Sequence, residues 1–157
     1  MKKSKSNKIS DHISFKEATN SNYAKQYGIK NVPSDEDIEN MKLVAEKVFE
    51  PLRDWVEAPI RVNSFYRSKE LNSAIKGSQV SSNLTGNAID ITSMGGKTNL
   101  EMFHYIKDNL DFDQLIWEFG AEPKWLHVSY KSKGNRKQVL VTKKQGVYYT
   151  WQNCKDC

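Results

Sequence analysis

The sequence predicts an α+β domain in which helices pack on one face of a central, mostly antiparallel sheet. Three observations support this fold class. The 157 residues suffice for one domain with a hydrophobic core, but not for two. Apolar residues recur every three or four positions over residues 34–55, which is typical of a helix buried along one side. Helices precede most of the segments with strand character, so we expect largely antiparallel pairing.

The first half of the chain is expected to hold three helices and one strand. Ser14, with Glu17 three residues later, has capping-box spacing and should begin a short helix. Ser34 should begin the longest helix, which Pro51 kinks or ends. The expected segments are a disordered basic leader over 1–10, helices beginning at 14, over 34–55 and over 69–76, and a strand over 60–64.

The second half is richer in strands. Residues 78–86 are polar and lack periodicity, so we expect an exposed loop. In the strand that follows, Ile89 and Ile91 share one face and Asp90 lies on the other. Thr98 should begin another helix through its capping box. The expected segments are strands over 87–92, 113–118, 125–130, 138–142 and 147–151, a helix over 98–109, and a tail over 152–157.

Composition and charge limit the classes of partner. A formal net charge of +5 suits either nucleic acid or an acidic polymer such as bacterial cell wall. The positive residues gather at 2–8 and 131–144, with no arginine and aromatic stripe between them, so we expect no nucleic-acid partner. No run approaches the roughly 20 apolar residues of a membrane span. We expect a monomer that does not enter membranes.

The two ends of the chain carry little functional signal. The N-terminal segment MKKSKSNKIS is basic, but no apolar segment follows it, so it does not have the pattern of a signal peptide. We therefore expect the protein to remain in the cytoplasm where it is made until something releases it. Cys154 and Cys157 form a terminal CKDC, which suits half of a zinc site or a redox pair. We interpret it as an incidental tail.

Three polar segments carry the candidate chemistry. The first, SFYR at residues 64–67, ends a strand and turns into a helix. The second, SSNLTGNAID at 81–90, runs from a loop into a strand, and the third, WLHVSY at 125–130, is a late strand. Alternation along the two strands lets Asp90 and His127 face one cleft.

These segments resemble the zinc D-Ala-D-Ala carboxypeptidases and related phage endolysins. That family carries an S-x-x-R turn, then S-x-H-x-x-G-x-A-x-D, then W-x-H on a late strand. Residues 12–18, 112–118 and 125–130 look especially like the phage members. The resemblance covers about residues 11–151 and implies a peptidase-like domain over that range, with the D-Ala-D-Ala carboxypeptidase and hedgehog-like fold. It implies zinc as cofactor and peptidoglycan stem peptides as substrate.

The resemblance also assigns residues to the site. A catalytic zinc takes three protein ligands and leaves a fourth position for water. Asp90 and His127 fall at the second and third ligand positions, but the first, a histidine in the family, is Asn83. An amide oxygen is a poorer zinc ligand than an imidazole nitrogen. Loss of the imidazole at this position should weaken metal binding at least about 10- to 100-fold. Arg67 falls where the family holds the substrate's carboxylate and oxyanion, and Ser82 is assigned to substrate binding.

The general base has two candidates. The family places an acidic residue shortly before the last histidine, to deprotonate the metal-bound water. Three positions before His127, where several relatives have that residue, this chain has Lys124. Glu122 and Glu118 remain, and we prefer Glu122 because it lies in the loop beside the metal-binding strand. An ordinary surface carboxylate is the alternative for both.

The other histidines and the late aromatic residues have structural interpretations. His12 and His104 are expected to be satisfied structural histidines rather than ligands. Aromatic residues near the end of the chain could line a groove for cell-wall muropeptides, although packing in the core and on the sheet is their commoner role. They are Trp117, Trp125, Tyr148, Tyr149 and Trp151.

Two functional hypotheses follow. The first is an active zinc peptidase that cleaves peptidoglycan stem peptides, as a phage lysis enzyme that waits for a membrane pore. The second is a catalytically inactive relative that binds the cell wall or belongs to the virion. Asn83 and Lys124 both favour the second. A deliberate substitution at Asn83 to trap substrate is a third interpretation.

Overall fold

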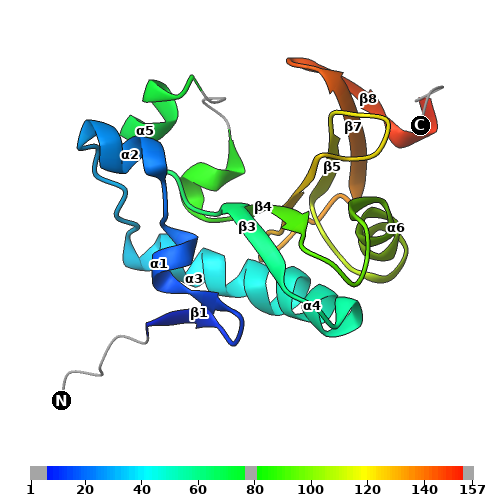
Figure 1. Cartoon of the computed structure of the whole chain (residues 1–157), viewed down its shortest axis with the longest axis horizontal. Coiled ribbons are helices and arrows are strands. Elements are labelled where there is room, and N and C mark those ends of the chain that lie inside the picture. The colour runs from blue at the N-terminus through cyan, green and yellow to red at the C-terminus, as the bar shows by residue number, and fades with distance from the viewer. Residues whose placement is uncertain (1–6, 77–80, 154–157) are drawn as a thin grey trace.

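A mixed sheet of six strands forms the centre of the domain (Figure 1). The structure is a computed structural model that describes residues 7–76 and 81–153. All neighbouring strands pair antiparallel except β5 and β7, which are parallel. In spatial order the strands are β3 (Ile60–Ser64), β4 (Ala88–Ser93), β6 (Trp125–Ser129), β5 (Gln114–Glu118), β7 (Gln138–Lys144) and β8 (Val147–Thr150). The predicted α+β class with a mostly antiparallel sheet is confirmed.

Four of the helical segments begin where the sequence signals place them, whereas the helix Asn22–Tyr27 was not predicted. The described residues contain α1 (Phe15–Ala18), α2 (Asn22–Tyr27), α3 (Asp35–Val44), the π-helical turn η1 (Ala45–Phe49), α4 (Glu50–Val56), α5 (Lys69–Ala74), the 3₁₀ turn η2 (Ser82–Thr85), α6 (Asn99–Asn109) and the 3₁₀ turn η3 (Trp151–Asn153). Ser14 caps α1, and Thr98 forms a complete capping box with Glu101 at α6. The predicted capping signals at these two helices are confirmed.

The longest helical stretch runs through α3, η1 and α4 without a break in the chain. Ser34 and Asp37 form the capping box at its start. Pro51, in the first turn of α4, does not end the stretch: a π-helical turn precedes it. Proline lacks an N–H group and crowds the carbonyl one turn earlier, and a π-turn is one of the ways a helix accommodates that conflict.

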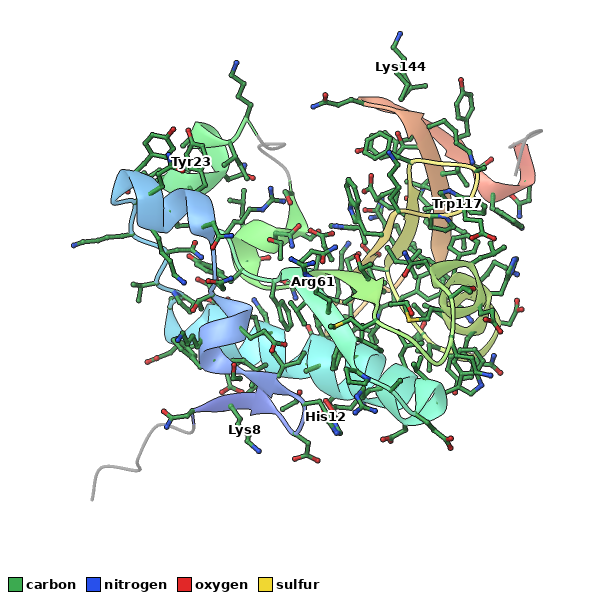
Figure 2. The ribbon with its side chains drawn as sticks, viewed as in Figure 1. Lys8, His12, Tyr23, Arg61, Trp117 and Lys144 are labelled. Carbon is green, nitrogen blue, oxygen red and sulfur yellow. The ribbon has the colours of Figure 1, made fainter. Side chains whose placement is uncertain are left out.

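The core lies between the sheet and its long helices. Ile89 and Ile91 of β4 are fully buried, as is Leu126 of β6. Trp117 of β5, labelled in Figure 2, is 2% exposed. It packs edge-on against Phe103 of α6, with 5.5 Å between ring centroids. Because strand side chains alternate, this burial turns Asp90, His127 and Glu118 to the opposite face.

Two predicted boundaries differ from the structure. Residues 8–10, assigned to a disordered leader, form β1 (Lys8–Ser10), which pairs with β2 (Ile13–Ser14). Ile9 is 6% exposed and packs in the core, so burial of its side chain orders this segment. Part of the predicted loop 78–86 is instead the turn η2, capped by Ser81. Residues 1–6 and the CKDC tail lie outside the described residues.

Candidate functional site

A cleft of about 430 Å³ lies on the face of the sheet opposite the core. Segments far apart in the chain contribute to it: the turn after β3, the turn η2, and strands β4 to β8. In Figure 1, α5 lies on one side of β4 and the β7–β8 hairpin lies on the other. The predicted site residues that line the cleft are Arg67, Ser82, Asn83, Asp90, Glu118 and His127.

Strand register brings the charged residues together. Asp90 of β4 lies directly opposite His127 of β6, and His127 lies directly opposite Ile116 of β5. Glu118 is two residues further along β5, on the same face as Ile116. Residues directly opposite or diagonal on one sheet face are within reach of each other's side chains. The register therefore places Asp90 beside His127, and Glu118 diagonal to His127, on the face of the sheet that lines the cleft.

Asp90 and His127 form a hydrogen-bonded pair. The Oδ1 atom of Asp90 lies 2.8 Å from Nδ1 of His127, and their side chains are 14% and 13% exposed. Burial by itself lowers the pKa of His127, but the carboxylates of Asp90 and Glu118 raise it, and the pKa ends above its ordinary value. When Nδ1–H donates to Asp90, the ring is held in one orientation and Nε2 is left for a ligand.

Arg67 reaches the cleft from the turn after β3. Its Nη2 donates to Ser81 Oγ at 3.2 Å and to Asn83 Oδ1 at 3.1 Å. Its Nε is buried and has no hydrogen-bond partner among the described residues. A buried donor without a partner is costly, and a carboxylate oxygen of a ligand would satisfy it. Arg67 is thus suited to bind an anionic group in the cleft.

The side chain of Asn83 is fully buried and fully hydrogen-bonded. Its Nδ2 donates to the carbonyls of Phe65 at 3.0 Å and Ala88 at 3.1 Å. Its Oδ1 accepts from Arg67 and, at 3.0 Å, from Ser81 Oγ. A side-chain amide has two donors and two acceptor positions, so all four are used. Turning Oδ1 toward a metal would leave both donors unsatisfied, at about 1–3 kcal/mol for each buried group.

The residues present do not fit the three-ligand zinc centre of the family. Asp90 and His127 can each offer one ligand atom, but the amide of Asn83 is committed elsewhere. Within residues 7–76 and 81–153, no group of three or more His, Cys, Asp or Glu side chains is arranged to hold a metal ion.

The two other histidines lie away from the cleft. His12 pairs with Glu50 and lines a separate cavity of about 330 Å³. His104 packs edge-on against Phe103 and Trp151, with centroid distances of 5.4 and 5.6 Å. Neither replaces the missing ligand, in agreement with the structural role expected for both.

Glu118, rather than Glu122, faces the cleft. Burial raises the pKa of Glu118 to about 7; the positive field of His127 opposes this shift and Asp90 adds to it. Glu122 is exposed in the turn that joins β5 to β6, away from the described residues that line the cleft. The preference for Glu122 rests on its position in the loop before β6. The distance of a β5 side chain from His127 is instead set by the antiparallel pairing of β5 with β6. The structure therefore favours Glu118.

The candidate aromatic groove divides into two groups. Trp125 and Tyr148 line the cleft, and Tyr148 is 53% exposed. Trp117 belongs to the core, and Trp151 packs against Phe103 at 5.2 Å. Tyr149 is exposed but is not among the described residues of the cleft.

Sequence reasoning missed several residues that line the cleft. On β5, the alternation that places Glu118 in the cleft also places two other side chains there, so the signal was present in the sequence. The missed lining residues are Ser81, Gln114, Ile116 and Leu140.

The family model described as Peptidase M15 matches residues 11–129, more than half of the chain. No curated protein matches the chain. Among the described residues, no helix has both the length and the apolar character needed to cross a membrane.

Proposed function

The chain belongs to the peptidase M15 family, whose members are peptidases of the zinc carboxypeptidase type, and we propose that its own substrates are the stem peptides of bacterial peptidoglycan. The observation that carries this proposal is the meeting of four charged or titratable side chains in one open cleft. These residues come from separate segments of the chain and line the same cleft. They are Arg67, Asp90, Glu118 and His127. The net charge of +5 favours approach to an acidic wall polymer.

In the first candidate function the cleft hydrolyses the peptide. Arg67 binds the substrate's terminal carboxylate through its guanidinium, whose Nε has no hydrogen-bond partner among the described residues. Glu118, with a pKa of about 7, can accept a proton from water near neutral pH. Zinc, when bound in the family's manner, supplies a Lewis acid, and Asp90 and His127 are the side chains that would hold it. Because Asn83 does not complete that centre, no further step is assigned to the metal.

The biological setting proposed for this activity is lysis of the host cell wall by a phage. The likeness of residues 12–18 and 112–118 to phage endolysins supports it. In this setting the protein accumulates in the host cytoplasm and reaches the wall when the membrane is opened. A place in the virion is the alternative location.

A second candidate function is binding of the wall without cleavage. The specific observation in its favour is that all four hydrogen-bonding positions of the Asn83 amide are used within the protein. Asp90 and His127 then remain as two of the family's three metal ligands. Arg67, together with Trp125 and Tyr148 in the cleft, would still recognise the peptide.

One experiment separates the two candidates. Purified peptidoglycan is incubated with the natural chain and with its Asn83→His variant, each with added zinc or with EDTA. New amino groups report cleavage, and co-sedimentation reports binding. Zinc-dependent release by the natural chain supports hydrolysis, whereas binding with release by the variant alone supports the second function. The His127→Ala variant is the control for cleavage and Arg67→Ala for binding. Absence of both cleavage and sedimentation contradicts the proposed substrate class.

A further inference from the structure

We propose that Asn83 is the positioning residue for Arg67, and that this chain uses the position of the family's first metal ligand to hold a guanidinium instead. The proposal deepens the function proposed above, since it concerns how the same cleft recognises a carboxylate. It rests on four side-chain hydrogen bonds, which we call the Asn83 network. Their partners are Phe65, Arg67, Ser81 and Ala88.

The first step concerns the orientation of the amide. Two backbone carbonyls, of Phe65 and Ala88, surround Nδ2, and both can only accept. The guanidinium of Arg67, which can only donate, faces Oδ1. Exchanging the two ends of the amide would place donor against donor and acceptor against acceptors. The partners therefore fix Oδ1 toward Arg67.

The second step concerns the backbone around the amide. Arg67 N donates to Asn83 O at 3.1 Å, so Asn83 holds Arg67 through both main chain and side chain. The two carbonyls that accept from Nδ2 belong to the segment after β3 and to the start of β4. Asn83 thus joins the segment that carries Arg67 to the strand that carries Asp90. A buried group with this many partners is held in one rotamer.

The third step concerns what remains free on Arg67. Its Nη2 is held by Asn83 and Ser81, while its buried Nε has no partner among the described residues. A guanidinium presents its N–H groups in a rigid fork, so fixing one nitrogen fixes the direction of the others. Asn83 therefore aims the unpaired donor, and loss of its acceptor oxygen would release the fork from that direction.

A matched pair of substitutions separates positioning from ordinary structural support. Asn83→Asp and Asn83→Leu are close in size to asparagine, and both remove the donation to Phe65 and Ala88. Asn83→Asp keeps an acceptor for Arg67, and Asn83→Leu does not. A purely structural role predicts that both variants lose stability and that their preference for a carboxylate is the same. A positioning role predicts that they differ in recognition of a carboxylate.

The probe is a synthetic stem peptide that ends in D-Ala-D-Ala, used as the free acid and as the C-terminal amide. Calorimetry measures both affinities, and thermal unfolding shows that each variant is folded. We expect both Asn83→Leu and Arg67→Ala to lose about 10-fold or more of the preference for the acid over the amide. Asn83→Asp should retain this preference within about threefold. Equal loss of preference in Asn83→Asp and Asn83→Leu overturns the proposal.

A second measurement does not depend on either variant folding. The natural chain and a Cys154→Ser, Cys157→Ser form are incubated with zinc, freed of excess metal, and assayed for bound zinc. The serine form removes any contribution from the terminal cysteines. We expect far less than one zinc per chain in the serine form, and one zinc per chain there overturns the proposal. If the peptide binds neither as acid nor as amide, the substrate class fails, while one zinc per chain in the serine form would still overturn the proposal for Asn83.

Discussion

Asp90 and His127 lie directly opposite each other on strands β4 and β6, and 2.8 Å separates Asp90 Oδ1 from His127 Nδ1. This hydrogen bond uses Nδ1 of the His127 imidazole and one oxygen of the Asp90 carboxylate. On the same face of the sheet and diagonal to His127, Glu118 is the other carboxylate among the described residues that line the cleft. The family's chemistry thus needs a proton acceptor that this pair does not supply.

We predict that Glu118→Gln lowers release of amino groups from peptidoglycan by about 100-fold, because the amide cannot accept a proton from water. The assay is run on the natural chain and, in parallel, in the Asn83→His background. Glu122→Gln is the matched control, since Glu122 is the same residue type in the exposed turn and should leave the rate unchanged. The opposite ranking of the two variants would restore Glu122 as the base.

Tyr148 is expected to contribute to peptide binding, while its neighbour Tyr149 is not. The two side chains have similar exposure, 53% and 48%, but Tyr148 is the one that lines the cleft. Tyr148→Ala should weaken binding of a stem peptide by about 5- to 10-fold through loss of aromatic contact area. Calorimetry with Tyr149→Ala as control tests this, and equal losses in both variants would contradict it.

The buried carboxylate of Asp113 should make stability depend on acid pH. Asp113 is 1% exposed, and its oxygens accept from Arg136 Nε at 2.9 Å and Nη2 at 2.8 Å. The hydrogen bonds from Arg136 hold the pKa of Asp113 below its ordinary value, against the effect of burial. The folded state therefore binds this proton less tightly than the unfolded chain does. The stabilisation is present above about pH 4 and is lost as the pH falls through the folded pKa.

The corresponding substitution is Asp113→Asn. We expect it to lower the free energy of unfolding at pH 7 by about 1–3 kcal/mol, in the lower part of that range because Arg136 is 52% exposed. Urea unfolding at pH 7 and pH 3 measures the effect, and the difference from the natural chain should shrink at pH 3. Asp108→Asn, which removes an exposed ion pair with Lys107, is the control. A difference that stays constant with pH would contradict the assignment.

Any side chain at Gly86 should destabilise the fold, because Gly86 ends the turn η2 and packs closely against α3. It has φ +77°, and a Cβ atom there would lie 2.5 Å from the carbonyl oxygen of Asp37. Gly134 has nearly the same φ, +75°, with open space around it. Gly134→Ala should therefore lower the melting temperature by about 2–4 °C through backbone strain alone, and Gly86→Ala by about 10 °C. Similar shifts in the two variants would show that the contact with α3 is unimportant.

Much of the fold could be predicted because its signals are local. The pairs Ser34–Asp37 and Thr98–Glu101 begin helices through contacts three residues apart. Alternation along β4 and β6 placed Asp90 and His127 on one face through the period of two that any strand has. Segment 8–10 was assigned wrongly because Ile9 gains its order from distant core residues.

The sequence by itself determined the family motifs, the strands that carry Asp90 and His127, and the absence of a histidine at position 83. Only the tertiary structure decided which of Glu118 and Glu122 lines the cleft, because that depends on the register of β5 against β6. It also decided which partners the side chain of Asn83 has. The amide's partners come from residues 65, 67, 81 and 88, and their convergence on one buried side chain depends on long-range packing that no local pattern encodes.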